Sequence, residues 1–151
     1  MASYFLDTSA AVKQYHFEPG TRRVAGIFSE PGSSIRISSI GLLEMQSAFA
    51  MKVRTGVIDQ RLAGMQRARL MLDIASGAIE VYSVTSDHLK DAALLIGRHG
   101  YTHRLRTLDA LQLAVALDLR GQGLLDHFVA ADRALAEVAI LEDVSVIDPE
   151  S

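Results

Sequence analysis

The sequence predicts an α/β fold with a mainly parallel sheet that helices cover on both faces. Short apolar segments alternate with longer segments in which apolar residues recur every three or four positions, and breaks at Pro and Gly separate them. Strands that alternate with helices need crossover connections, which are right-handed and lay the helices against the sheet. No linker, repeat or low-complexity segment interrupts this pattern, so residues 1–151 are expected to form one domain.

Five short segments have the apolar composition of buried strands. They cover residues 3–6, 35–37, 79–84, 128–131 and 144–147. Sites in sheets of this kind form beyond the carboxyl ends of the strands. Asp7 and Asp132 follow or end two of the predicted strands, so both side chains are expected at that edge of the sheet.

The helices predicted between these strands begin at residues that commonly cap helices, and several end near Gly or Pro. The expected ranges are about 10–16, 21–29, 39–54, 59–76, 86–100, 107–121 and 133–138. One of the three residues 7–9 would cap the first helix, and Ser86 and Thr107 would cap two later ones. The helix of residues 59–76 carries a stripe of apolar residues that would pack in the core or form part of an interface.

The composition limits the kind of protein this is. The chain of 151 residues is 49% apolar and 22% charged, which is ordinary for a globular protein, and it has no Cys, which excludes disulfides and thiolate metal sites. No apolar stretch approaches the roughly 20 residues of a membrane span, and the first residues lack the pattern of a signal peptide, so a cytoplasmic protein without a membrane partner is expected. The net charge of −3 argues against a simple electrostatic nucleic-acid binder.

Four acidic residues lie inside apolar sequence. Asp7 and Asp132 end apolar strands, and Glu44 and Asp109 lie within apolar helices. Ionised carboxylates are rarely buried unless they are paired or bind a metal. Hard cations such as Mg²⁺ and Mn²⁺ take oxygen ligands, so the four residues together predict a carboxylate cage for such a cation.

Each of these acids also has a structural interpretation. Asp7 and Asp132 are favourable N-caps, and the dipole of a helix favours an acid in its first turn, where Asp109 lies. The neighbours of Glu44 three and four residues away are small or apolar, so its side chain would point into the protein or a cleft. An ion pair with an Arg would explain an acid in that place. Only the four residues taken together favour a metal site over caps and ion pairs.

Polar neighbours of the four acids are further candidates. Thr8 and Ser9 are placed to orient a ligand water or a carboxylate by hydrogen bonding, although both are also good helix caps. Arg104 and Arg106 closely precede Asp109 and are candidates for contacts with a phosphate. The alternative for both arginines is an exposed loop in contact with solvent.

Four local patterns occur in the order in which one protein family has them. A strand ends in Asp followed by Thr and Ser (5–10), a helical Glu is followed by small residues (43–48), an Asp-Ala-Leu-x-Leu-Ala helix comes next (109–114), and a strand leads to Asp and a short helix (128–135). With this ordered set the chain resembles the PIN-domain family, and within it the VapC-type toxins, over nearly its whole length. Each pattern alone is weak, whereas the ordered set is specific.

The resemblance implies a three-layer α/β/α domain around a parallel sheet of about five strands. It implies an endoribonuclease that acts on RNA and uses Mg²⁺ or Mn²⁺, with Asp7, Glu44, Asp109 and Asp132 as catalytic and metal-binding residues. It also implies a homodimeric toxin of a type II toxin–antitoxin pair, inhibited by a small cognate antitoxin. The chain departs from the family at Ala131, where many members have Thr or Ser, so a supporting hydrogen bond is expected to be missing beside Asp132.

Three other functions compete with this one. A nuclease of the same fold without a toxin role would act in RNA processing or on DNA. A non-catalytic PIN-like binding module would keep the fold without the chemistry, although the four intact acids argue against it. An aspartyl-phosphate phosphotransferase would also place Asp7 and Thr8 after a strand, but Ser9 stands where such enzymes commonly have a second Asp.

Overall fold

Five parallel strands form one sheet in the computed structural model, which describes residues 1–151. Their order is β3-β2-β1-β4-β5, so β1 lies at the centre. The strands are β1 (Ser3–Leu6), β2 (Ser34–Ser38), β3 (Glu80–Tyr82), β4 (His127–Val129) and β5 (Val146–Ile147). The prediction of a parallel α/β sheet with about five strands is confirmed. The last three strands are shorter than the predicted segments, because only these residues pair with a neighbouring strand.

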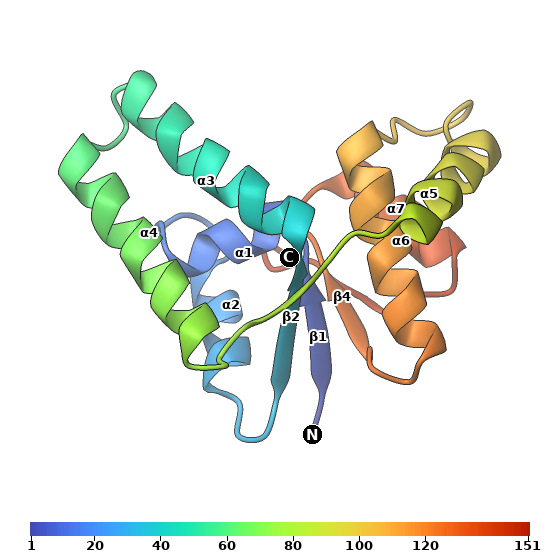
Figure 1. The fold of residues 1–151 in the computed structure, drawn as a ribbon, viewed down its shortest axis with the longest axis horizontal. Helices are drawn as coiled ribbons and strands as arrows, with labels where there is room; N and C mark the ends of the chain where they lie inside the picture. Colours follow the sequence, from blue (N-terminus) through green and yellow to red (C-terminus); the bar gives the residue numbers. More distant parts are fainter.

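Helices form the two outer layers, one on each face of the sheet (Figure 1). One face carries α1 (Thr8–Ala11), the 3₁₀ turn η1 (Val12–Gln14), α2 (Thr21–Ser29), α3 (Ser39–Arg54) and α4 (Gln60–Ala75). The other face carries α5 (Ser86–His99), α6 (Thr107–Gly121) and α7 (Arg133–Leu141). This is the expected three-layer α/β/α arrangement. None of these helices is both long enough and apolar enough to cross a lipid bilayer.

The starts of α3, α4 and α5 depend on capping side chains. Ser38 and Asp59 accept hydrogen bonds from backbone N–H groups in the first turns of α3 and α4. For α5 the predicted cap Ser86 is wrong. Thr85 caps this helix, because its side chain and that of His88 each accept a hydrogen bond from the other's backbone N–H.

The first helix and α6 also differ from the prediction. The first helix begins at Thr8 instead of residue 10, because Asp7 already serves as its cap, and beyond Ala11 it tightens into η1. Thr107 is the first residue of α6 and not its cap, since the extended backbone before the helix lies at Arg106, whose side chain makes no capping bond. The positive end of α6 is therefore stabilised by Asp109 in its first turn.

The chain reverses its direction across the sheet at β1. From β1 it proceeds to β2 and β3, and α5 and α6 then return it to β4 on the opposite side of β1. The boundary between β1 and β4 is the topological switch point, where open α/β sheets form their crevices. The backbone N–H of Asp7 donates to the carbonyl oxygen of Val129 at 3.1 Å, so the two strands stay paired up to this edge. Beyond it, α3 and α6 diverge (Figure 1).

Two apolar cores flank the sheet because alternate residues of each strand face opposite sides. Phe5 and Phe128 face α5, α6 and α7, and their rings stack with centroids 5.7 Å apart. Tyr4 and Leu6 belong to the core on the other face, together with Val129 of β4. The central strand β1 is thus buried on both sides, as parallel strands between two helical layers are.

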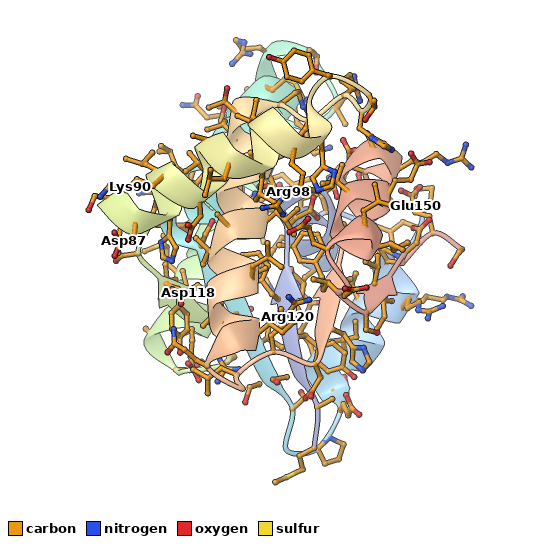
Figure 2. All side chains as sticks on the ribbon, turned by 90° about the vertical axis from the view of Figure 1, so that its right-hand side faces the viewer. Asp87, Lys90, Arg98, Asp118, Arg120 and Glu150 are labelled. Carbon is orange, nitrogen blue, oxygen red and sulfur yellow. The ribbon has the colours of Figure 1, made fainter.

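Ion pairs from α5 and a hydrogen bond from α6 tie these two helices to the end of α7. Glu142 accepts hydrogen bonds from Arg98 at 2.6 and 2.7 Å, and the His99 ring lies 2.8 Å from it. Burial alone raises the pKa of Glu142, but these bonds and charges hold it below its usual value. Arg120 donates to the carbonyl oxygen of Glu142, and Figure 2 shows Arg98 and Arg120 projecting toward α7. This network fixes the layer of helices that carries Asp109.

Gln66 on α4 is a buried polar residue for which a substitution has a clear expected outcome. Its Nε2 lies 3.3 Å from Nδ1 of His16, while its Oε1 has no hydrogen-bond partner in the protein. An unsatisfied buried acceptor costs about 1–3 kcal/mol, so Gln66→Met is expected to leave the Tm unchanged or to raise it. Thermal unfolding followed by circular dichroism measures this, and a Tm lowered by more than about 5 °C would contradict it.

Candidate active site

One cavity at the switch point brings the four predicted acids together. It has a volume of about 270 Å³. Its lining includes the four acids Asp7, Glu44, Asp109 and Asp132. These come from the ends of β1 and β4 and from the helices α3 and α6. The predicted supporting residues Thr8 and Ser9 line the same cavity, as does Arg106.

Ser9 joins the segments that follow β1 and β4. Its Oγ donates to Asp7 Oδ1 at 2.7 Å and accepts from the backbone N–H groups of Ala131 at 2.9 Å and Asp132 at 3.3 Å. The backbone N–H of Ala10 donates to the same oxygen of Asp7, at 3.0 Å, as expected for the cap of α1. Ser9 therefore holds the backbone of the Ala131–Asp132 segment, whereas the side chain of Ala131 has no hydroxyl to offer beside Asp132.

Asp7 is the most deeply buried of the four acids, with 3% of its surface exposed. The pKa of Asp7 is raised to about 7, mainly by burial. Hydrogen bonds from Ser9 and Ala10 lower it in part, and the charges of Asp109 and Asp132 add to the increase. Near neutral pH the carboxyl group is therefore partly protonated. Both protein donors reach Oδ1, and none reaches Oδ2.

Glu44 is held by neutral donors and not by the arginine that its structural interpretation required. Its Oε1 accepts hydrogen bonds from Thr8 Oγ1 at 2.9 Å and from Gln112 Nε2 at 2.8 Å. No Lys or Arg lies within ion-pair distance of Glu44. An ion pair therefore does not explain why this acid lies in an apolar helix.

Arg106 lies between Asp109 and Asp132. Its Nε donates to Asp109 Oδ2 at 2.9 Å, and its Nη2 donates to Asp132 Oδ2 at 3.3 Å. The hydrogen bond and the charge of Asp109 raise the pKa of Arg106. Arg104 reaches only to 4.0 Å from Asp132 Oδ2. Asp132 Oδ1 accepts from the backbone N–H of Leu135 at 3.0 Å, so Asp132 caps α7 and faces the cavity at the same time.

The donor set of this cavity suits a hard divalent cation. The four acids supply carboxylate oxygens, which Mg²⁺ and Mn²⁺ prefer. Asp7 Oδ2, Glu44 Oε2 and Asp109 Oδ1 accept no hydrogen bond from the protein. In the present arrangement no three of the acids lie close enough together to hold an ion. Binding would therefore require the carboxylates to draw together and the guanidinium of Arg106 to withdraw.

Two features of the cavity were missed from the sequence. Gln112 connects α6 to Glu44, and Arg106 pairs with two of the acids instead of lying free in a loop. The signal for Gln112 is present, because it is a lone polar residue in the apolar run 110–116, three residues after Asp109 and on the same side of the helix. No feature of the sequence indicates which of two nearby arginines turns toward the acids.

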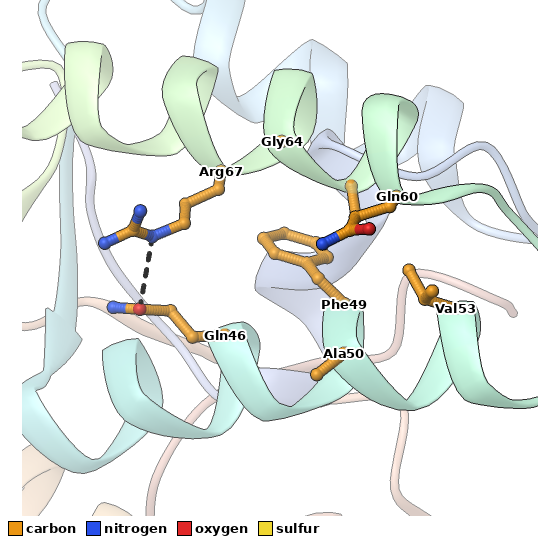
Figure 3. Close-up of a pocket in the computed structure, with 8 residues that line it drawn as sticks. Gln46, Phe49, Ala50, Val53, Gln60, Gly64 and Arg67 are labelled. Atoms are coloured by element: carbon orange, nitrogen blue, oxygen red, sulfur yellow. Dashed lines mark hydrogen bonds between the residues drawn. The ribbon is translucent and has the colours of Figure 1, made fainter.

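A second, separate cavity lies between α3 and α4. Its volume is about 460 Å³, and its apolar lining includes Phe49, Val53 and Ala63. Figure 3 shows Phe49 between the two helices and, at one end, the hydrogen bond of 3.4 Å from Arg67 Nε to Gln46 Oε1. None of the four acids lines this cavity, so it offers apolar contacts and no metal ligands.

The sequence matches the PIN domain family over residues 4–147. The chain belongs to this family. The match contains all four acids and every strand except the first residue of β1, so the resemblance inferred from the four local patterns is confirmed. None of the curated proteins is similar enough in sequence to match.

Solved structures with the same fold include one described as a toxin and one described as a toxin–antitoxin complex. VapC20 from Mycobacterium tuberculosis, described as a sarcin–ricin loop cleaving toxin, is 22% identical with a TM-score of 0.63, covering 89% of this chain and 93% of that one. FitAcB from Neisseria gonorrhoeae is 18% identical with a TM-score of 0.67, and a toxin–antitoxin complex from Klebsiella pneumoniae is 15% identical with a TM-score of 0.62. Each of these two alignments covers 97% of both chains. At such identities the likeness shows the fold.

The raised pKa of Asp7 predicts that its charge destabilises the fold at high pH. The folded protein holds the proton up to about pH 7, whereas the unfolded chain loses it near 3.8, so the stability that this proton contributes is complete below 3.8 and is lost as the pH rises through 7. Asn keeps an oxygen to cap α1 and carries no charge. Asp7→Asn is therefore expected to raise the Tm by at least about 3 °C at about pH 8, and by progressively less toward about pH 4.

Thermal unfolding of both proteins across this pH range, without divalent ions, measures the difference. Asp91→Asn on α5 is the control, because Asp91 is exposed and lies outside the cavity. It should show no comparable trend. A gap between Asp7→Asn and the wild type that stays constant with pH would contradict the assigned protonation.

Proposed function

We propose that this protein is a metal-dependent endoribonuclease that hydrolyses RNA phosphodiester bonds. The observation that carries the proposal is that Asp7, Glu44, Asp109 and Asp132 line one cavity at the switch point of a PIN domain. Gathering like charges in a partly buried space costs free energy unless a cation or another partner offsets it. Helix caps and helix dipoles explain single acids, but they do not explain why four acids line the same cavity.

In this proposal Asp7, Glu44 and Asp109 hold Mg²⁺ or Mn²⁺, directly or through water, and Asp132 completes that site or serves a second ion. Such an ion, when bound, polarises the phosphoryl oxygen and lowers the pKa of a water molecule. Asp7 must be ionised to act as a ligand, so its raised pKa makes ion binding stronger as the pH increases through 7.

The residues around the acids hold them and offer contacts to phosphate. Ser9 positions Asp7 and the backbone of the Ala131–Asp132 segment, and Thr8 positions Glu44. Arg106 neutralises Asp109 and Asp132 while no ion is bound, and after it withdraws its guanidinium is available to an RNA phosphate. The exposed Arg104 offers a second phosphate contact.

We also propose that the protein is the toxin of a type II toxin–antitoxin pair, acting in the cytoplasm as a homodimer of single domains. The structural neighbour from Klebsiella pneumoniae, which is described as a toxin–antitoxin complex, supports an inhibitory antitoxin partner. Two surface features support protein partners in general. The cavity between α3 and α4 offers apolar contacts, and Met65 and Leu72 on α4 are more than half exposed, as apolar residues at interfaces are in a free chain.

Asp109→Asn is expected to abolish metal-dependent cleavage and to leave the fold intact. Asn removes a charged ligand but keeps the size of the side chain, and the partner Arg106 is largely exposed and can turn to solvent. The measurement is cleavage of structured RNAs, tRNAs included, by protein freed of any bound antitoxin, with Mg²⁺, with Mn²⁺ and with a chelator. Cleavage should fall at least about 100-fold, since even the outer partners of metal ligands contribute 10–100-fold.

The exposed Asp91 again provides the matched control, and Asp91→Asn should cleave as the wild type does. Cleavage that persists in Asp109→Asn, or in the presence of chelator, would refute the assignment. A wild type that binds Mn²⁺ but cleaves only DNA would favour a DNA nuclease. A folded wild type that neither binds an ion nor cleaves would favour the non-catalytic binding module.

Replacing Arg104 and Arg106 together by Ala is expected to weaken RNA binding to a similar extent for all sequences. Phosphate contacts make affinity depend on salt, and each contact contributes roughly 0.7 to the slope of log K against log salt for single strands, so the loss of two contacts should reduce its magnitude by roughly 1.4. Fluorescence anisotropy with labelled RNA, in the Asp109→Asn background to prevent cleavage, measures this slope. Arg23→Ala on the exposed side of α2 is the control. If the slope of log K against log salt does not change, neither arginine contacts phosphate, and their role is limited to pairing with the acids.

A further inference from the structure

Gln112 is a buried amide on α6, in the apolar run that follows Asp109. Only 1% of its surface is exposed, and its neighbours in α6, Leu111 and Leu113, are buried as well. A buried amide is unfavourable unless its donors and acceptor are satisfied. The contacts of Gln112 must therefore explain why a polar residue occupies this buried position.

Both contacts of the Gln112 Nε2 group are residues of the acidic cavity. Nε2 donates to Thr8 Oγ1 at 2.8 Å and to Glu44 Oε1 at 2.8 Å, and Thr8 Oγ1 itself donates to Glu44 Oε1 at 2.9 Å. The three groups thus form a closed triangle of hydrogen bonds. The Thr8 hydroxyl already donates to Glu44 Oε1, so the reverse orientation of the amide would set its oxygen against an acceptor oxygen.

Gly41 of helix α3 leaves room for this amide. A Cβ atom added at Gly41 would lie 3.1 Å from Gln112 Oε1, closer than ordinary van der Waals contact. Gly is unfavourable inside a helix, and here the close approach of α6 gives a reason for it. Ser38, which caps α3, lies 3.5 Å from the same Oε1. Gln112 thus links the start of α3 to α6 across the cavity.

We infer that Gln112 is a positioning residue that fixes Glu44 as a metal ligand, an inference that rests on the proposed function. Gln112 and Thr8 hold Oε1 of Glu44 and leave Oε2 without a protein donor. Because both donors are neutral, they orient the carboxylate without cancelling its charge, whereas Arg106 offsets the charge of Asp109. Outer partners that orient a ligand in this way typically contribute about 10–100-fold to metal affinity.

The test is the affinity of the apo protein for Mn²⁺, measured by electron paramagnetic resonance or calorimetry without RNA. Gln112→Met keeps the length of the side chain and removes its donors, and it should weaken Mn²⁺ binding about 10–100-fold. Gln66→Met is the matched control, since Gln66 is another buried helical glutamine, outside the acidic cavity, and its replacement should leave Mn²⁺ affinity unchanged. Thr8→Val removes the other donor and should act in the same direction, which keeps the test valid if Gln112→Met does not fold.

A merely structural link between α3 and α6 would give a different result. If Gln112 acts through Glu44, Gln112→Met should have little further effect on Mn²⁺ affinity in a Glu44→Gln background. One contrary result is that Gln112→Met lowers Mn²⁺ affinity equally with and without the Glu44 carboxylate, and another is that it leaves the affinity equal to that of the wild type. Either result would overturn the inference about Gln112 but not the proposed function. A wild type that binds no Mn²⁺ would overturn the proposed metal-dependent function together with it. Mn²⁺ binding without RNA cleavage would overturn the nuclease proposal and leave the inference about Gln112 to stand on the affinities.

Discussion

The parallel pairing of β1 with β4 is the constraint on which the acidic cavity depends. It brings Asp7 and Asp132 to the same edge of the sheet, although they lie near opposite ends of the sequence. The register cannot slip by one residue, because that would turn the fully buried Phe5 and Phe128 toward the wrong layer. Ser9 depends on this register, since its single hydroxyl reaches both Asp7 and the backbone beyond β4.

The protein offsets the mutual repulsion of the four acids in three different ways. Asp7 is buried, and its raised pKa allows it to keep a proton near neutral pH. Glu44 is stabilised by neutral donors. Asp109 and Asp132 share the guanidinium of Arg106. A divalent cation would replace the proton and the guanidinium but would leave the neutral donors in place, so the neutral contacts are the permanent part of the cavity.

The two helices that frame the cavity belong to different layers, and α3 and α6 diverge from the edge of the sheet (Figure 1). The outer network around Glu142 fixes α6 against α5 and α7 but has no contact with α3. Close to the sheet, Gly41 allows α6 to approach α3, and Gln112 uses this space. This contact near the sheet therefore helps to set the positions of Glu44 and Asp109 relative to each other.

The sequence by itself determined the α/β class, the parallel sheet and the identity of the four acids. Apolar periodicity and helix breaks are local properties, and an acid within an apolar run is visible without knowledge of the fold. Most helices were predicted close to their observed bounds, whereas the cap of α5 was assigned one residue too late, because several adjacent residues can cap equally well.

Only the tertiary structure decided the strand order, which places Asp7 and Asp132 on either side of the switch point. It also decided that Ser9 holds the backbone beyond β4, that Arg106 turns toward the acids, and that Gln112 holds Glu44. These contacts join residues far apart in the chain or choose among chemically equivalent neighbours. The sequence therefore specified the four acids, and the packing of two helical layers on one sheet specified how they meet, because distances between such segments exist only after the chain has folded.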